Sequence, residues 1–339
     1  MDAALFYSCR GGGYKGGCGV CPMHPAYSVI VFTVASGAGY GLLFAMAAAA
    51  LVGFAPVASW LAIAASALAL ALAGIGGAAS FFHLGHPERA WRALSQWRSS
   101  WLSREAVLAL AAVPVALGFG VAWWVAGTGP AAAWLPAVAV GAAAVAVATV
   151  IATSKIYATL RAIPAWHNPW VTPGYLACAG LSGALLLQGM VAIAGQVAVA
   201  LATAAAAAAV VAGAIKLAYW RSIDRAPAAS TAESATGLGR FGAVTLLDPP
   251  HTSTNFLLTE MGYRVARRHA RRLRAVAAIA AFLVPGLLSL ALVWLEGAWA
   301  TVGASCAVAG ATLGLVVERW LFFAEAKHTV MLYYGDARV

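Results

Sequence analysis

Two side chains that can bind and release protons are predicted to lie at the same depth of a membrane. His83 ends a long apolar segment, and Glu105 begins the next one, so the chain between them leaves and returns to one place. Histidine titrates near neutral pH, and partial burial can raise the pKa of a carboxyl toward the same range. Together the pair could pass two protons as two electrons move. A quinone headgroup needs such a pair beside an apolar slot for its tail.

The residues between this pair have the pattern of a short helix lying on a membrane surface. Pro87 suits the first turn of a helix, and arginines alternate with apolar residues after it. The apolar residues recur at helical spacing: Ala90, Trp91, Leu94, Trp97 and Trp101. Simple anchoring by Trp and Arg at headgroup depth explains most of this stretch. Arg104, His86 and Trp101 are additional candidates for the quinone pocket.

Both members of the pair also have a structural interpretation. His83 could cap the end of its helix at the membrane surface. Glu105 stands two residues beyond Ser103, a possible N-cap, and could simply complement the helix dipole. The residue types alone leave these interpretations open.

Other ionisable groups suggest weaker sites. Glu318 and Arg319 lie near the inner end of the last apolar segment, where ionisable residues are commonly functional, although a local ion pair with a neighbouring helix would also explain them. The N-terminal extension contains Cys9, Cys18 and Cys21, which with His24 could hold zinc, but two clear ligand pairs are lacking. All seven histidines fall at segment ends or in loops, so we expect no haem between helices.

The composition requires a membrane as solvent. Of 339 residues, 63% are hydrophobic and only 9% are charged, against about 25% charged in soluble domains. The formal net charge of +10 could suggest nucleic acid. However, the basic residues stand between long apolar segments, which favours basic loops on one membrane side and no nucleic-acid partner.

The predicted fold is all-α, an integral bundle of eight transmembrane helices. A spanning helix needs about 20 mostly apolar residues. Eight segments qualify, near 26–53, 57–82, 104–125, 131–153, 174–194, 196–219, 275–295 and 300–323. Pairs of small residues, such as Gly37 and Gly41, predict close helix packing.

All 21 Lys and Arg residues fall on one side of this arrangement. The links near 54–56, 126–130, 195 and 296–299 contain none of them. The positive-inside rule therefore predicts that both termini are cytoplasmic. The chain divides into an extension, 1–22, and a membrane domain, 23–339, with cytoplasmic loops near 83–103, 154–173 and 220–274. Met23 is a possible true start.

The last of these loops is large enough to bind a partner. An amphipathic helix is predicted from Thr254, followed by arginines between Arg267 and Arg274. Such a basic cluster most often meets anionic membrane lipid. A partner protein on the cytoplasmic face is the other interpretation.

Several motifs resemble the DmsC family, the membrane-anchor subunits of dimethyl sulfoxide reductase and related molybdopterin oxidoreductases. They are HLGHPERAWRAL…WRSSWLSRE, SKIYATLR-IPAWH and ERWLFFAEAKH…LYYG, and the resemblance extends from Met23 onward. The opening MHPAYSVIVFT…SGAGYGLL and the segment LLDPPHTSTNFL look closer to the SoeC branch, which is associated with sulfite oxidation. The extension before Met23 departs from the family.

The resemblance implies a haem-free anchor in the bacterial cytoplasmic membrane, with His83 and Glu105 matching the family's quinol-site histidine and glutamate. It would exchange electrons between menaquinone or ubiquinone and an iron–sulfur subunit, which serves a molybdopterin catalytic subunit. Both partners would dock on the cytoplasmic face, and the anchor itself would not transform the sulfur substrate. The alternatives are a secondary transporter, disfavoured by polar groups at the segment ends, and a haem b membrane cytochrome.

Overall fold

A computed structural model describes residues 27–54, 60–82, 84, 86–128, 133–227, 230–248, 267–334 and 339. Within these ranges the chain is helical and has no β-strand. Eight helices of the described part are long and apolar enough to cross a membrane. The all-α prediction of eight spans is therefore confirmed, and the chain is a multi-pass membrane protein.

The membrane helices run in chain order. They are α1 (Tyr27–Leu51), α2 (Trp60–Phe81), α3 (Trp101–Thr128), α4 (Leu135–Ala158), α5 (Val171–Ile193), α6 (Val199–Arg225), a seventh span built from α10 (Ala270–Ala278), the π-helical turn η3 (Ile279–Leu283) and α11 (Val284–Ala291), and α12 (Gly297–Ala324). The shorter helices are η1 (Pro87–Gln96), α7 (Ala232–Thr236), η2 (Gly239–Phe241) and η4 (Thr329–Tyr334).

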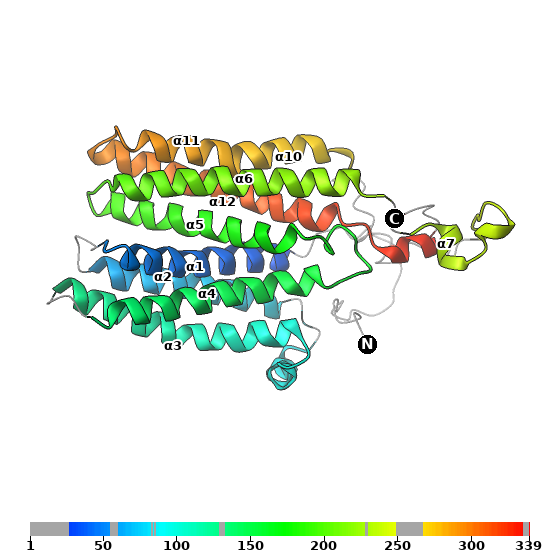
Figure 1. Ribbon diagram of the computed structural model, residues 1–339, viewed down its shortest axis with the longest axis horizontal. Helices are drawn as coiled ribbons and strands as arrows, with labels where there is room; N and C mark the ends of the chain where they lie inside the picture. The colour runs from blue at the N-terminus through cyan, green and yellow to red at the C-terminus, as the bar shows by residue number, and fades with distance from the viewer. Residues whose placement is uncertain are drawn as a thin grey trace, which may run out of the picture.

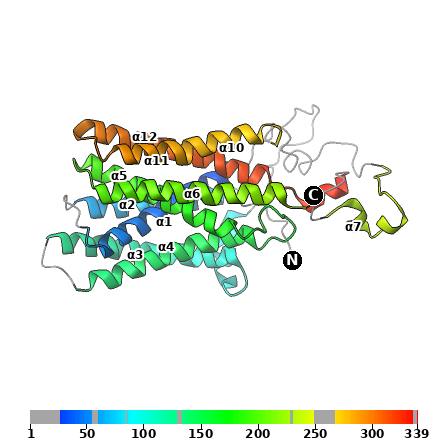
Figure 2. The ribbon, with the colours of Figure 1, turned by 45° about the horizontal axis from the view of Figure 1, so that its top comes forward.

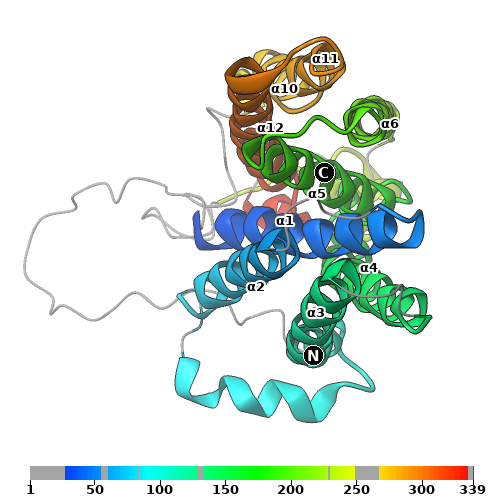
Figure 3. The same ribbon diagram turned by 90° about the vertical axis from the view of Figure 1, so that its left-hand side faces the viewer.

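The spans form two groups of four that share a central seam. In the first group α1 packs on α2 and α4, and α3 packs on α2 and α4. In the second group α5 and α12 pack on each other, with α6, α10 and α11 outside them. Helix α1 joins the groups by packing on α5 and α12, and it lies at the centre of the bundle when viewed along the helices (Figure 3).

One end of the bundle carries the longer connections. Helix η1, α7 and the C-terminus all lie at this end (Figures 1 and 2). We call it the basic end, because the links at the opposite end contain no Lys or Arg. The predicted partition of charge between two ends is thus reproduced by the fold, while the cytoplasmic placement of the basic end stays a prediction.

Several helices are longer than their apolar segments predicted. Helix α4 continues five residues past the predicted end at 153, α6 continues six residues past 219, and the seventh span begins five residues before 275. Hydropathy marks only the part of a helix that lipid can surround. The backbone hydrogen bonds continue beyond it, where long polar side chains can reach toward water. The predicted loops 154–173 and 220–274 are correspondingly shorter.

The seventh span contains a π-helical turn with a local cause. Pro285 has no N–H, so it cannot donate a regular helical hydrogen bond. In the preceding turn, the N–H of Val284 bonds to the carbonyl of Ile279, five residues back. A wide turn of this kind lets the helix pass the proline without ending.

Small residues bring α1 against its neighbours, as predicted, but not at every predicted position. Gly41 and Gly183 face each other where α1 crosses α5, and a Cβ on either would collide with the other helix's backbone. Gly39 meets α2 in the same way, with a Cβ only 2.7 Å from the backbone nitrogen of Ala73. Gly37 does not serve close packing, because a Cβ there would meet nothing within 4 Å.

Candidate functional site

Helix η1 confirms the short surface helix predicted from Pro87. It spans ten residues as a 3-10 helix with Pro87 in its first turn, and no residue in it is buried. It lies across the direction of the membrane helices at the basic end (Figure 3). This orientation returns the chain to the bundle at Trp101, where α3 begins.

The N-cap of α3 is Ser100, not Ser103 as predicted. The Ser100 hydroxyl oxygen accepts from the backbone N–H of Ser103 at 3.5 Å, while the Ser103 side chain is buried. A capping serine precedes the first helical residue by one position, and α3 begins earlier than its apolar segment suggested. Glu105 consequently lies more than one turn inside the helix. Complementing the helix dipole therefore does not account for its position, because that effect is confined to the first turn.

Glu105 points into the protein and not into lipid or water. Glu105 is only 7% exposed, and its carboxyl accepts a hydrogen bond from the hydroxyl of Thr153 on α4. Thr153 also lies 3.1 Å from the carbonyl oxygen of Thr149. A buried carboxyl with a hydroxyl partner can exchange a proton through that partner.

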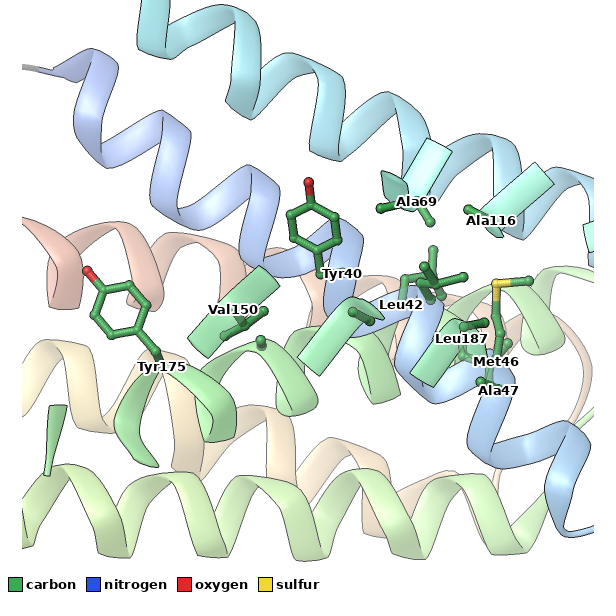
Figure 4. Close-up of a cluster of buried hydrophobic side chains, with 14 of the residues drawn as sticks. Tyr40, Leu42, Met46, Ala47, Ala69, Ala116, Val150, Tyr175 and Leu187 are labelled. Atoms are coloured by element: carbon green, nitrogen blue, oxygen red, sulfur yellow. The ribbon is translucent and has the colours of Figure 1, made fainter. Parts of the chain in front are cut away.

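Thr153 also lines a small cavity with several polar side chains. The cavity measures about 30 Å³, enough for water but too small for an aromatic ring, and is formed by α1, α4, α5 and α12. Its polar side chains are Thr33, Ser36, Tyr40, Thr153, Tyr175, Ser182 and Arg319. Figure 4 shows Tyr40 and Tyr175 at one end of the buried cluster, with Met46 and Leu187 further along the bundle. The cavity and its polar side chains thus lie in the half of the membrane core nearer the basic end.

A buried ion cluster borders the cavity. Arg319 donates to Glu318 at 2.5 Å, and Lys216 of α6 forms an ion pair with the same carboxylate. All three residues are at most 5% exposed. The Arg319 guanidinium also lies 4.1 Å from the ring centre of Tyr175. The predicted ion pair with a neighbouring helix therefore exists, and it joins Glu318 to Lys216 of α6.

A second ion-pair group connects this region to the basic end. Arg274 donates to both Asp224 oxygens at 2.7 and 2.9 Å and to Glu325 at 2.8 Å. Burial raises the pKa of Glu325, with Arg274 and then Lys216 opposing that shift. Lys216 and Arg274 both lie near the ring of Trp220, at 5.5 and 5.7 Å from its centre. The two ion groups are therefore neighbours.

The loop after α4 closes the bundle over these groups. Trp166 donates its ring N–H to the Phe322 carbonyl at 3.0 Å, which fixes the loop to the end of α12. Tyr157 lies edge-on to both Trp166 and Phe322, at 5.3 and 5.6 Å between ring centres, and 6.0 Å from Tyr175. This aromatic layer separates the cavity from the basic surface.

The other predicted pocket residues have contacts of their own. His83 lies outside the described residues, so its pairing with Glu105 stays a prediction. Arg104 donates to the carbonyls of Trp97 and Arg98 at 2.9 and 2.6 Å and stacks on Trp101 at 4.4 Å. These contacts tie the start of α3 to the turn after η1.

Four histidines are described, all of them near the basic end, and His269 is exposed. His86 is exposed and pairs with Glu88 at 2.9 Å. The Nδ1 of His167 lies 2.8 Å from the Ala158 carbonyl oxygen. Burial and the nearby Arg267 lower the pKa of His328 to about 4, so this side chain is neutral at physiological pH. Of these four, only His86 belongs to the predicted pocket, and its described partner is Glu88.

The proposed zinc ligands Cys9, Cys18, Cys21 and His24 lie outside the described residues, as does the predicted helix from Thr254. Among the residues that the structure describes, no group of three His, Cys, Asp or Glu side chains could hold a metal ion.

The sequence interpretation missed Thr153 and Lys216. A threonine in an apolar segment usually bonds to its own helix backbone, so its pattern gives no signal for a carboxylate partner. Lys216 was counted with the basic loop, although it stands in the apolar run AGAIKLAYW. That context is the available signal, since a lysine so deep in a span needs a partner.

Comparisons with known proteins agree with this architecture. The family model described as "DMSO reductase anchor subunit (DmsC)" matches residues 23–293. The chain belongs to this family. The chain is also 35% identical to a sulfite dehydrogenase subunit of Allochromatium vinosum, over 92% of this chain and 99% of that protein.

The DmsC match covers the first seven spans and ends before α12. Glu105, Thr153 and Lys216 lie inside the matched range, while Glu318 and Arg319 lie beyond it. The similarity to the sulfite dehydrogenase protein extends over almost the whole chain. The resemblance inferred from the sequence motifs is therefore confirmed, including its leaning toward the sulfite branch.

Proposed function

We propose that this chain is the quinone-binding membrane anchor of a molybdopterin oxidoreductase in the bacterial cytoplasmic membrane. It would pass electrons between the quinone pool and an iron–sulfur subunit. The observation that carries the proposal is a buried, hydrogen-bonded carboxyl, Glu105, near the basic end of a family member. Membership of the anchor family supports the role as a subunit of such an enzyme.

The residues near Glu105 have the chemical properties that a quinone headgroup requires. A quinone supplies two-electron redox chemistry coupled to two protons, and Glu105 is a proton carrier without an ionic partner in the described contacts. Phe81 at the end of α2 and Phe82 directly after it are 50% and 87% exposed and offer an apolar surface directly before His83 in the sequence. The cavity behind Thr153 is too small for the ring. We therefore propose that the headgroup approaches Glu105 from the side of α2.

We propose that the iron–sulfur partner docks at the basic end. This end holds the surface helix η1 and the protruding segment around α7 (Figure 2). The segment exposes apolar side chains that a partner could cover, since Phe241 is 74% exposed and Leu247 is fully exposed. Docking there would keep the distance from Glu105 to the partner short.

Sulfite is the favoured substrate of the assembled enzyme. The similarity to a protein of a sulfite dehydrogenase extends over almost all of both chains, which supports electron flow from sulfite to quinone. The sulfur chemistry would take place on the molybdopterin subunit. The anchor's own task would be to exchange electrons and protons with quinone.

Substitution of the predicted proton carriers tests the proposal. We expect His83→Ala and Glu105→Gln to leave the assembled complex intact and to reduce quinone-linked turnover at least tenfold, because each removes a group that exchanges protons with the headgroup. The measurement is steady-state turnover with a soluble quinone analogue, beside turnover with an artificial electron acceptor that reacts at the partner subunits.

Matched controls are available among the exposed residues. His269→Ala and Glu296→Gln alter exposed residues of the same types and should retain full quinone-linked turnover. Unchanged quinone kinetics in both site variants would refute the site assignment. Purification of the chain without an iron–sulfur protein would refute its role as an anchor.

A further inference from the structure

The ion cluster is placed where it can exchange protons with Glu105. Among the described residues, four ionisable side chains of the acidic or basic types are buried: Glu105, Lys216, Glu318 and Arg319. Two are acids and two are bases. Burying unbalanced charge is costly, so the protonation of one member should depend on the others.

The cavity lies between the two parts of this set. Thr153 reaches it from the side of Glu105, and Arg319 reaches it from the side of the cluster. Its volume of about 30 Å³ is sufficient for one or two water molecules. Its wall is mostly apolar, but it carries several hydroxyls and a guanidinium group, which are the partners that a bound water molecule needs.

Unpaired groups on the cavity wall support the presence of water. The Tyr175 hydroxyl and one terminal nitrogen of Arg319 are both buried and lack a hydrogen-bond partner among the described residues. Both residues line the cavity and are at most 6% exposed. Buried polar groups rarely remain unpaired, and bound water is the usual partner when protein atoms are lacking.

We propose that water in this cavity forms a proton-exchange route between Glu105 and the Lys216–Glu318–Arg319 cluster. The route runs from the carboxyl through the Thr153 hydroxyl and the cavity water, past Tyr175 and Arg319. The step starts from protonated Glu105 and a neutral Lys216 amine. One proton leaves Glu105 and one is taken up by Lys216, which then forms the charged ion pair with Glu318, and no electron moves. With Glu318 and Arg319 charged throughout, the four groups sum to zero charge both before and after the transfer.

The cluster has a continuation toward the basic surface. Lys216 and Arg274 lie near Trp220, and Arg274 pairs with Glu325 and with Asp224, whose side chain is 57% exposed. One carboxylate oxygen of Glu325 is buried and lacks a hydrogen-bond partner among the described residues. Arg274 links this group to Asp224 at the surface. The route leaves Glu105 on the side of Thr153, whereas the proposed headgroup approach is from the side of α2.

The biological role of this route rests on the proposed function, because only a carboxyl that serves quinone chemistry needs rapid proton exchange. Its test uses no quinone. The full chain in lipid nanodiscs is moved from H₂O to D₂O, and infrared spectroscopy follows the carbonyl band of protonated Glu105. The band is identified by its absence in Glu105→Gln.

Two substitutions should interrupt the route by different means. Thr153→Val keeps the side-chain shape but removes the hydroxyl, and we expect hydrogen–deuterium exchange to slow at least tenfold. Gly37→Val should fill the cavity from α1, since Gly37 lines it and a Cβ there meets nothing within 4 Å. We expect a similar slowing.

Gly180→Val is the matched control. A Cβ at Gly180 also meets nothing within 4 Å, and this glycine does not line the cavity. Exchange should stay at the wild-type rate. The route is overturned if Thr153→Val and Gly37→Val exchange as fast as wild type, or if the control slows equally. Such a result, combined with lost turnover in Glu105→Gln, would leave the proposed function standing.

Discussion

At the scale of single residues, burial separates the functional candidates from the anchoring ones. Glu105 and Arg104 are adjacent in the sequence, yet one carboxyl is enclosed while the guanidinium binds carbonyls of the preceding turn. The sequence could identify Glu105, because a carboxyl at the start of a span is rare. It could not identify Thr153, because only helix packing brings that hydroxyl from α4 to the carboxyl.

The members of the ion cluster are expected to contribute unequally to the stability of the protein. Glu318→Gln would leave Lys216 and Arg319 buried without a counter-charge, and we expect a loss of about 3–5 kcal/mol in stability. Lys216→Met should cost less, because the Glu318–Arg319 pair remains. Thermal unfolding of the detergent-solubilised chain measures both. The control is the exposed Glu296→Gln, and equal destabilisation by all three changes would contradict the role of the cluster.

At the scale of elements, glycine positions decide where helices cross. The spacing of Gly37 and Gly41 correctly predicted a close contact of α1, but only Gly41 takes part in it. Gly37 faces the cavity, and Gly39 packs on α2. A spacing of four places two residues on one helix face without specifying which of them meets the neighbour. That choice depends on the crossing point, which is a property of two helices.

The α1–α5 crossing gives a test at this scale. We expect Gly183→Ala to destabilise the bundle by about 1–3 kcal/mol or more, because its Cβ would overlap the Gly41 backbone and force the helices apart. Gly180→Ala, on the same helix, places its Cβ in open space and should be neutral. Thermal unfolding and monodispersity in detergent are the measurements. Equal stability of the two variants would show that the helices are not packed this closely.

At the scale of the whole molecule, charge divides the bundle into two ends. The basic end holds η1, the C-terminus and the loop fixed by Trp166, while the opposite links are short. Glu105, the cavity and the ion cluster all lie in the part of the membrane domain nearer this end. Proton exchange and partner docking would therefore share one side of the membrane.

The orientation in the membrane follows from the positive-inside rule and can be measured. We expect Glu296→Cys to react with a membrane-impermeant thiol reagent in spheroplasts, and Ser99→Cys to react only in inverted vesicles. Both positions are exposed, and they lie at opposite ends of the bundle. The cysteines of the N-terminal extension would be replaced by serine beforehand. Reversed labelling would contradict a cytoplasmic basic end.

The sequence by itself determined the properties that depend on solvent. The number of spans, the grouping of Lys and Arg at one end, the surface helix from Pro87 and the family all follow from local composition and motifs. The length of an apolar segment and the charge of a loop are local properties, so they can be read directly from the sequence. The same is true of Glu105 as a candidate proton carrier.

Only the tertiary structure decided which polar side chains share an interior. Thr153 meets Glu105, Lys216 meets Glu318, and the cavity joins four helices that are distant in sequence. These contacts depend on how far and at what angle the helices cross, which small residues such as Gly41 and Gly183 set in pairs. A buried charge finds its partner through that packing, and no single segment encodes it.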